Sequence, residues 1–133
     1  MRKFVADANI LFSLGKESTK TSEMAKKYSL KIYSPLYTIE ELKKHSKEIE
    51  DKTKIKFEEF YKSIEKKVIL IKTNDIKEEI KKCSKALSDP DYIIYIALSN
   101  KLNLPIWLND KDFKEQYQRL VLNTEEMIEL LED

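Results

Sequence analysis

Val68-Ile69-Leu70-Ile71 is an unbroken run of β-branched residues and leucine. Such a run is typical of a strand that is covered on both faces, as in a parallel sheet. Four other short apolar runs predict strands, at residues 3–6, 30–33, 105–108 and 119–122. Because helical patterns alternate with these strands, the sequence predicts an α/β/α sandwich on a parallel sheet.

The segments between the strands carry apolar residues at helical spacing. We expect helices at residues 9–14, 22–29, from Leu36 onward, 50–66, 76–87, 92–102 and from Asn123 or Thr124 to Leu131. The segment 92–102 is apolar almost all round, which predicts a helix in the centre of the molecule. Asp89, directly before Pro90, is the predicted N-cap of that helix.

Length and composition indicate one domain that spans residues 1–133. Hydrophobic residues make up 41% of the 133, enough for a single core. The one glycine excludes the glycine-rich loops of dinucleotide-binding and P-loop proteins. Cys83 and His45 are the only residues of their types, which excludes an internal disulfide and a cysteine zinc site. No apolar run approaches the ~20 residues of a membrane span, so we expect a soluble, cytoplasmic protein with no membrane partner.

The net charge is only +1, but the charges are unevenly distributed along the chain. Residues 1–72 hold 17 Lys and Arg against 11 Asp and Glu, whereas residues 73–133 hold 8 against 13. This asymmetry permits a basic flank beside an acidic centre. Taken alone, the charge count is explained more simply by a lysine-rich, solvated surface.

Acidic residues follow the predicted strands at the points where open parallel sheets bind ligands. Asp7 follows the first strand, Glu41 lies in the helix after the second, and Asp110 and Asp112 follow the fourth. Asp91 begins the helix before that fourth strand, so it should lie at the same edge. Several carboxylates stay ionised together only beside a cation, and oxygen ligands favour Mg²⁺ or Mn²⁺. The pattern therefore predicts a metal site of the kind that acts on phosphates.

Most of these acids also have a local structural explanation. The helix dipole favours Asp91 in a first turn, and Asp110 can cap a short helix at residues 111–116. Thr38 and Glu41 fit a capping box. Asp7 is the hardest to explain in this way, because it directly follows an apolar strand and should be buried. The convergence of all these acids on one edge favours a functional site.

In these segments the chain resembles the PIN-domain nucleases. Phe4-Val5-Ala6-Asp7-Ala8-Asn9 is similar to the family's opening strand and first acid. Ser34-Pro35 followed by Ile39-Glu40-Glu41-Leu42 resembles its second-acid helix. Residues 91–98 resemble its third-acid helix and residues 106–113 its closing segment. One position departs from the pattern, because the residue two before the last acid is often Thr or Ser in the family and is Leu108 here.

The resemblance implies a three-layer α/β/α sandwich with a central five-stranded parallel sheet. It also implies Mg²⁺- or Mn²⁺-dependent cleavage of mostly single-stranded RNA by activated water. By matched position, Asp7, Glu41, Asp91 and Asp110 would be the catalytic and metal-binding acids. Asp112 would be an auxiliary metal ligand, and Asn9 would support the first acid.

The same resemblance implies partners. The substrate would be RNA, and Lys43 and Lys44 beside Glu41 are candidate contacts to its backbone. Small members of the family include VapC-type toxins, which implies an antitoxin or regulatory partner, and others process RNA. Small PIN proteins often pair, so we expect a homodimer.

Two other classes of function are compatible with parts of the sequence. A domain of this shape can also be a binding module for RNA or protein with a weak catalytic centre. A haloacid-dehalogenase-type phosphatase also begins with an acid at the end of a strand, but it needs a second acid where Asn9 stands. The set Asp7, Glu41, Asp91 and Asp110 favours the nuclease.

Overall fold

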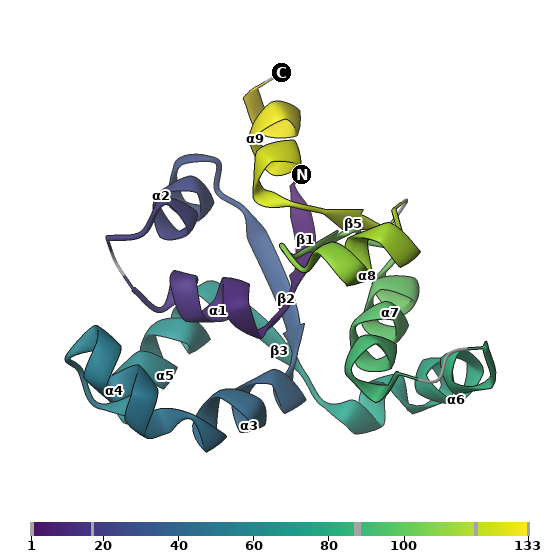
Figure 1. Ribbon diagram of the computed structural model, residues 1–133, viewed down its shortest axis with the longest axis horizontal. Coiled ribbons are helices and arrows are strands. Elements are labelled where there is room, and N and C mark those ends of the chain that lie inside the picture. Colours follow the sequence, from purple (N-terminus) through teal and green to yellow (C-terminus); the bar gives the residue numbers. More distant parts are fainter. Residues whose placement is uncertain (1, 17, 87–88, 119, 133) are drawn as a thin grey trace.

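A five-stranded, all-parallel sheet forms the centre of the molecule (Figure 1). The computed structural model describes residues 2–16, 18–86, 89–118 and 120–132. The strands are β1 (Lys3–Ala6), β2 (Lys31–Pro35), β3 (Val68–Ile71), β4 (Ile106–Trp107) and β5 (Val121–Leu122), in the order β3-β2-β1-β4-β5. The predicted parallel sheet is confirmed.

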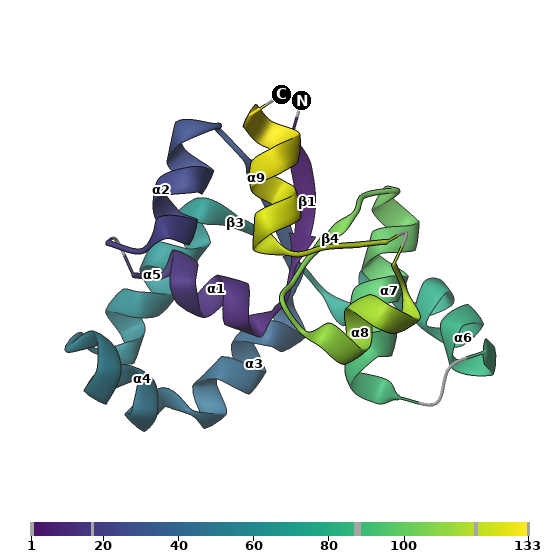
Figure 2. The same ribbon diagram turned by 45° about the horizontal axis from the view of Figure 1, so that its top comes forward.

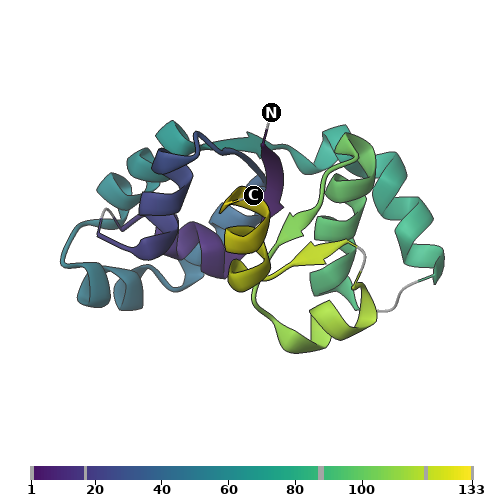
Figure 3. The same ribbon diagram turned by 90° about the horizontal axis from the view of Figure 1, so that it is seen from above.

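Helices cover both faces of this sheet, which gives the three layers that the sequence predicts (Figures 2 and 3). The α-helices are α1 (Ala8–Leu14), α2 (Lys20–Lys27), α3 (Leu36–Lys44), α4 (Ser46–Thr53), α5 (Phe57–Lys67), α6 (Lys77–Ala86), α7 (Pro90–Leu102), α8 (Lys111–Gln116) and α9 (Thr124–Glu132). A 3₁₀ turn, η1 (Thr73–Ile76), precedes α6. Within the described part of the chain, no helix is both long enough and apolar enough to cross a membrane.

The alternation of side chains along β1 divides the core into two clusters. Phe4 and Ala6 belong to the cluster under α1, α2, α5 and α9, whereas Val5 belongs to the cluster under α6, α7 and α8. All three side chains are buried, and Val5 and Ala6 are completely so. β1 is therefore covered on both faces. Asp7 follows its last residue, Ala6, at the carboxyl edge of the sheet and is the N-cap of α1.

Helix α7 is the central helix that the sequence predicts. Every residue from Ile93 to Ser99 is buried. Asp89 caps the helix as expected, since its side chain accepts a hydrogen bond from the amide of Asp91 at 2.9 Å. The helix runs toward β4, so its N-terminus lies at the carboxyl edge of the sheet.

The prediction of one helix over residues 50–66 is wrong. The segment belongs to two helices, α4 and α5, because Lys54 adopts a left-handed conformation (φ 62°) that ends α4. The Glu50 carboxylate then accepts a hydrogen bond from the amide of Phe57 at 2.8 Å, which stabilises the start of α5.

Several predicted boundaries also differ from the observed ones. Strand β2 continues through Pro35, whereas β4 and β5 are each only two residues long. The predicted helix at 76–87 is a 3₁₀ turn followed by α6. Leu87 and Arg119, which the predicted elements included, lie outside the described residues.

The strand order creates a topological switch point between β1 and β4. The chain builds β1, β2 and β3 outward in one direction and then returns to add β4 and β5 on the other side of β1. Loops that leave β1 and β4 therefore diverge to opposite faces of the sheet. In open α/β sheets the crevice at such a point is where ligands bind.

The close contact of Gly15 with Phe60 generates the first prediction. A Cβ atom at Gly15 would lie 2.1 Å from Cε2 of Phe60, whose side chain is fully buried and cannot swing into solvent. We expect Gly15→Ala to lower the free energy of unfolding by about 1–3 kcal/mol, measured by urea denaturation. Replacement of Phe60 by Leu in the same protein should reduce the cost of the alanine. An unchanged midpoint in Gly15→Ala would contradict the contact.

Candidate active site at the carboxyl edge of the sheet

A cavity of about 300 Å³ lies at the switch point. Four carboxylates that are far apart in the sequence line it, namely Asp7, Glu41, Asp91 and Asp110. Asn9 lines it as well. Asp112, Lys43 and Lys44 are not among its lining residues, although Lys44 contacts Glu41. No basic side chain is present among the described residues that form its wall.

Asp7 lies deepest among these acids. It is the N-cap of α1, and its Oδ1 accepts a hydrogen bond from the amide of Ile10 at 3.0 Å. Burial of the carboxylate raises its pKa from 3.8 to about 6, and the negative charge of Asp110 acts in the same direction. Asp7 thus carries a carboxylate that the metal-free protein ionises only at a cost.

Glu41 is held in its ionised form from two sides. The hydroxyl of Tyr37 donates a hydrogen bond to it, and Lys44 Nζ lies 3.3 Å from its Oε1, so the pKa of Glu41 is lowered. The same hydrogen bond is the main reason that the pKa of Tyr37 is raised to about 12. The sequence does not single out this partnership, because a tyrosine four residues before an acid is common on any helix.

The predicted capping box of Thr38 and Glu41 is absent. Helix α3 begins at Leu36 after Pro35, so Thr38 lies inside the helix and not at its cap. Glu41 is consequently not used to close the helix end, and it faces the cavity instead.

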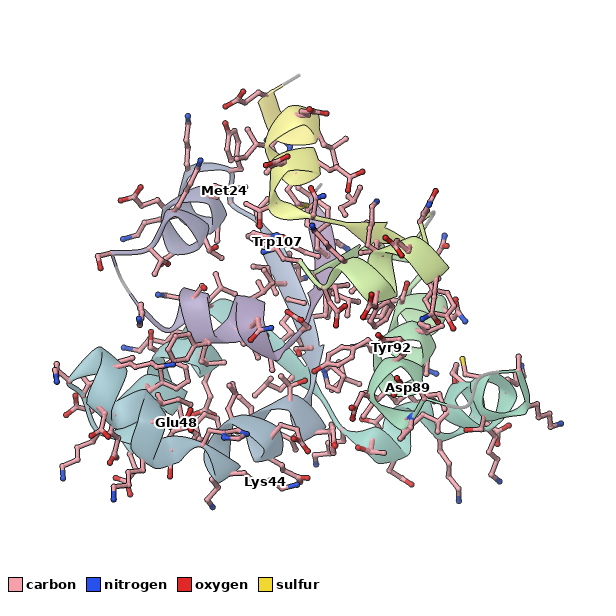
Figure 4. All side chains as sticks on the ribbon, in the orientation of Figure 1. Met24, Lys44, Glu48, Asp89, Tyr92 and Trp107 are labelled. Carbon is pink, nitrogen blue, oxygen red and sulfur yellow. The ribbon has the colours of Figure 1, made fainter. Side chains whose placement is uncertain are left out.

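Asp91 and Asp110 lie at the exposed rim of the cavity. Asp110 also caps α8, as expected, because its Oδ1 accepts a hydrogen bond from the amide of Phe113 at 3.2 Å. Tyr92 lies close to Asp89 at the start of α7 (Figure 4). Its ring packs on Phe113 with centroids 4.2 Å apart, and the charges of Asp110, Asp89 and Asp112 act on its hydroxyl. Asp110 thus caps α8 and also lines the shared cavity.

A chain of buried hydroxyls fastens the backbone on both sides of Asp7. Tyr95 accepts a hydrogen bond from the amide of Ala8, and its oxygen lies 2.9 Å from Thr38 Oγ1. Thr38 Oγ1 lies 3.1 Å from Ser34 Oγ, and Ser34 Oγ lies 2.8 Å from the carbonyl oxygen of Ala6.

Ser34 is the donor at one end of this chain. Its Oγ has donor geometry toward the carbonyl oxygen of Ala6, which only accepts, and toward Thr38 Oγ1. Between Thr38 and Tyr95 either hydroxyl can donate. All three hydroxyls are therefore paired inside the core.

Leu108 stands where the family often has a hydroxyl, and it is buried in the cavity wall. The loop after β4 is held by other contacts. Asn109 Oδ1 accepts hydrogen bonds from the amide and the hydroxyl of Thr124, and Trp107 Nε1 donates to the same hydroxyl at 3.1 Å. These contacts tie the segment that carries Asp110 to the start of α9.

The donor set of the cavity fits a hard divalent cation. All four acids offer carboxylate oxygens, and burial together with the charge of Asp110 raises the pKa of Asp7. Across the ranges that the structure describes, no three acidic, histidine or cysteine side chains are already gathered as closely as metal ligands are. The four acids therefore share a cavity without forming a finished ligand cluster.

The buried carboxylate of Asp7 gives a pH-dependent prediction for the metal-free protein. Because its pKa in the folded state is about 6, above 3.8, folding favours the protonated form, and this carboxyl destabilises the protein progressively as the pH rises from about 4 to about 6. Asn mimics the neutral acid and can keep the cap. In EDTA, Asp7→Asn should raise the free energy of unfolding by up to about 3 kcal/mol at pH 7 and leave it nearly unchanged at pH 4.

Urea denaturation across this pH range measures the effect. Asp51→Asn, at an exposed position of α4, is the matched control and should show no such dependence. A gain at pH 7 that persists unchanged at pH 4 would show that burial of the Asp7 charge is not its cause.

The hydroxyl chain predicts a specific loss of stability. Tyr95→Phe removes the partner of the Ala8 amide and one of the two partners of the Thr38 hydroxyl, which keeps only Ser34, and a buried polar group that loses a partner is costly. We expect the free energy of unfolding to fall by about 1–3 kcal/mol in thermal or urea denaturation. Tyr61→Phe, which removes a hydroxyl on α5 outside this chain, is the control. Equal stability of the two variants would refute the role of the network.

Comparisons with known proteins bear on the family and the fold of the chain. The sequence pattern of the PIN domain matches residues 5–128. The fold is similar to a chain in the crystal structure of VapBC2 from Rickettsia felis bound to a DNA fragment from their promoter, with a TM-score of 0.65 and 11% sequence identity over 91% of this chain and 98% of that one. No sequence match was found among curated proteins. The match over nearly the whole chain, together with the shared fold, shows that this chain belongs to the PIN-domain family.

Proposed function

We propose that the chain is a metal-dependent endoribonuclease that hydrolyses phosphodiester bonds of mostly single-stranded RNA. PIN domains are generally nucleases, which supports the reaction class. The observation that carries the proposal is the cavity in which Asp7, Glu41, Asp91 and Asp110 meet without a basic side chain among its described lining residues. Such a wall repels a phosphodiester unless a cation is present.

The same acids would hold Mg²⁺ or Mn²⁺ in this proposal, with Asp112 in the first turn of α8 as an auxiliary ligand. The ion would supply charge neutralisation at the phosphate and a more acidic bound water. Asp7 would remain ionised at neutral pH in its presence. The hydroxyl chain through Tyr95 would keep the backbone beside Asp7 in place when the ion binds and when it leaves.

Glu41 is the residue best suited to orient the attacking water. Tyr37 and Lys44 keep it ionised, so it can accept a hydrogen bond from water at any pH near neutral. Asn9 adds a neutral amide beside it, and Lys43 and Lys44 lie on the same helix for contact with the RNA backbone. Attack by water in line with the 3′ oxygen leaves a 5′-phosphate and a 3′-hydroxyl, with no role for the 2′-hydroxyl.

The likeness to a VapBC2 chain supports a regulatory setting for this activity. We propose an antitoxin-type protein as the partner that restrains the nuclease, and the formation of a homodimer in solution. RNA processing is the alternative setting, and a growth assay on expression of the chain alone separates the two.

The reaction is tested with end-labelled single-stranded RNA. Wild-type protein with Mn²⁺ should produce fragments with 5′-phosphate ends, and EDTA should abolish them. Asp7→Asn should reduce the rate by about 100-fold or more, because it removes a charge from the set that would bind the ion. Asp51→Asn should cleave like the wild type.

Two further results discriminate between the proposals. A 2′-deoxy substitution at the cleaved position should leave cleavage intact, because water is the nucleophile. If the protein binds RNA but does not cleave it with either Mn²⁺ or Mg²⁺, the nuclease proposal is wrong and the chain is a binding module.

A further inference from the structure

A second cavity adjoins the acidic one, and Glu41 forms part of the wall between them. It has a volume of about 340 Å³ and shares Ala8, Asn9 and Glu41 with the first cavity. It opens between α1 and the corner at which α3 meets α4. A group bound at the acids would therefore have direct access to this neighbouring space.

The second cavity has an apolar floor and a polar rim. Phe12, Leu42 and Ile49 form the floor, and Leu42 and Ile49 are anchored in the core. Phe12 itself packs on Phe60, with ring centroids 6.0 Å apart. A floor that is fixed by the core can receive a flat apolar face without rearranging.

The rim offers both hydrogen-bond donors and acceptors. His45, Glu48 and Lys52 contribute to it from the α3–α4 corner, and Asn9 from α1. Figure 4 shows Glu48 beside the corner between α3 and α4, whereas Lys44 lies on the side of α3 that faces away from α1. A nucleobase has the matching character, since its faces are apolar and its edges carry donors and acceptors.

The distribution of charge favours this side for the substrate. All residues that line the second cavity belong to the first 72 of the chain, which carry the excess of Lys and Arg. On the opposite side of the acidic cavity, α7 and α8 present the exposed acids Asp89 and Asp112. The second cavity carries Glu41 and Glu48 in its own lining, but it also carries Lys52, a cation of a kind that the described lining of the acidic cavity lacks. A polyanion that reaches the acids is therefore repelled less on the side of α4 than on the side of α7 and α8.

We propose that the cavity between α1 and the α3–α4 corner binds one RNA base adjacent to the bond that is cleaved. The inference rests on the proposed nuclease function for its substrate class. Glu48 would accept a hydrogen bond from an amino or imino group on the base edge, while Phe12 and Ile49 would contact its face. The site would give the enzyme a base preference at one position beside the cut.

Nucleotide binding tests the cavity without requiring cleavage. The methyl signal of Ile49 is followed by NMR in wild-type protein with EDTA, during titration with AMP, CMP, GMP or UMP. At least one nucleotide should shift this signal in a saturable manner, whereas ribose 5-phosphate should not. Ile80 on α6, outside the cavity, is the internal control.

Variants assign the interaction to the rim. Glu48→Gln should weaken binding of the preferred nucleotide at least fivefold and flatten the base preference in RNA cleavage. Glu58→Gln, at an exposed position of α5, is the matched control and should change neither. An equal effect of the two variants would overturn the role of Glu48 in recognition.

The outcomes separate this inference from the nuclease proposal. If no nucleotide shifts Ile49, or if ribose 5-phosphate shifts it equally, the base site is wrong even for a protein that cleaves RNA. If a nucleotide binds there but RNA is never cut, the base site stands and the nuclease proposal fails.

Discussion

The site depends on one carboxylate, that of Asp7, which is held half-buried at the end of the central strand in the wall of the acidic cavity. Because strand β1 is covered on both faces, the residue that follows it is partly shielded from solvent. The amide of Ile10 stabilises the ionised form, but burial and the charge of Asp110 outweigh it, and the pKa rises to about 6. The hydroxyl chain from Ala8 to Ala6 keeps the backbone from relaxing to relieve this cost.

Much of this arrangement could be predicted because it depends on local pattern and on one topological rule. The strand at residues 68–71 and the caps at Asp89 and Asp110 are local signals, and the structure confirms each of them. The expectation that this strand is covered on both faces is wrong, because β3 lies at the edge of the sheet and Ile69 is 40% exposed. The gathering of Asp7 and Asp110 at one cavity follows from the return of the chain to the other side of β1, which parallel sheets with helical crossovers impose. The catalytic and metal-binding roles of these acids remain predictions.

What the sequence could not predict involves partners that are distant along the chain. Thr38 fits a capping box locally, yet its hydroxyl pairs with Tyr95, 57 residues away, because tertiary packing brings α7 against the start of α3. The break at Lys54 is stabilised by Glu50, which bonds the amide of Phe57 across the corner. The neighbouring sequence predicts neither hydrogen bond, because a threonine near the start of a helix and a glutamate within a helix are both common.

The position of the acidic cavity relative to the two halves of the chain bears on how a polyanion would reach it. Residues 1–72 supply the wall that contains Asp7 and Glu41, and residues 73–133 supply the wall that contains Asp91 and Asp110. The cavity thus lies on the boundary between a half with excess positive charge and a half with excess negative charge. Charges separated by more than about 8 Å are largely screened at physiological salt, so only those near the cavity orient a strand as it docks. Lys44 is placed for this role, because it is exposed and yet tied to Glu41 at the cavity wall.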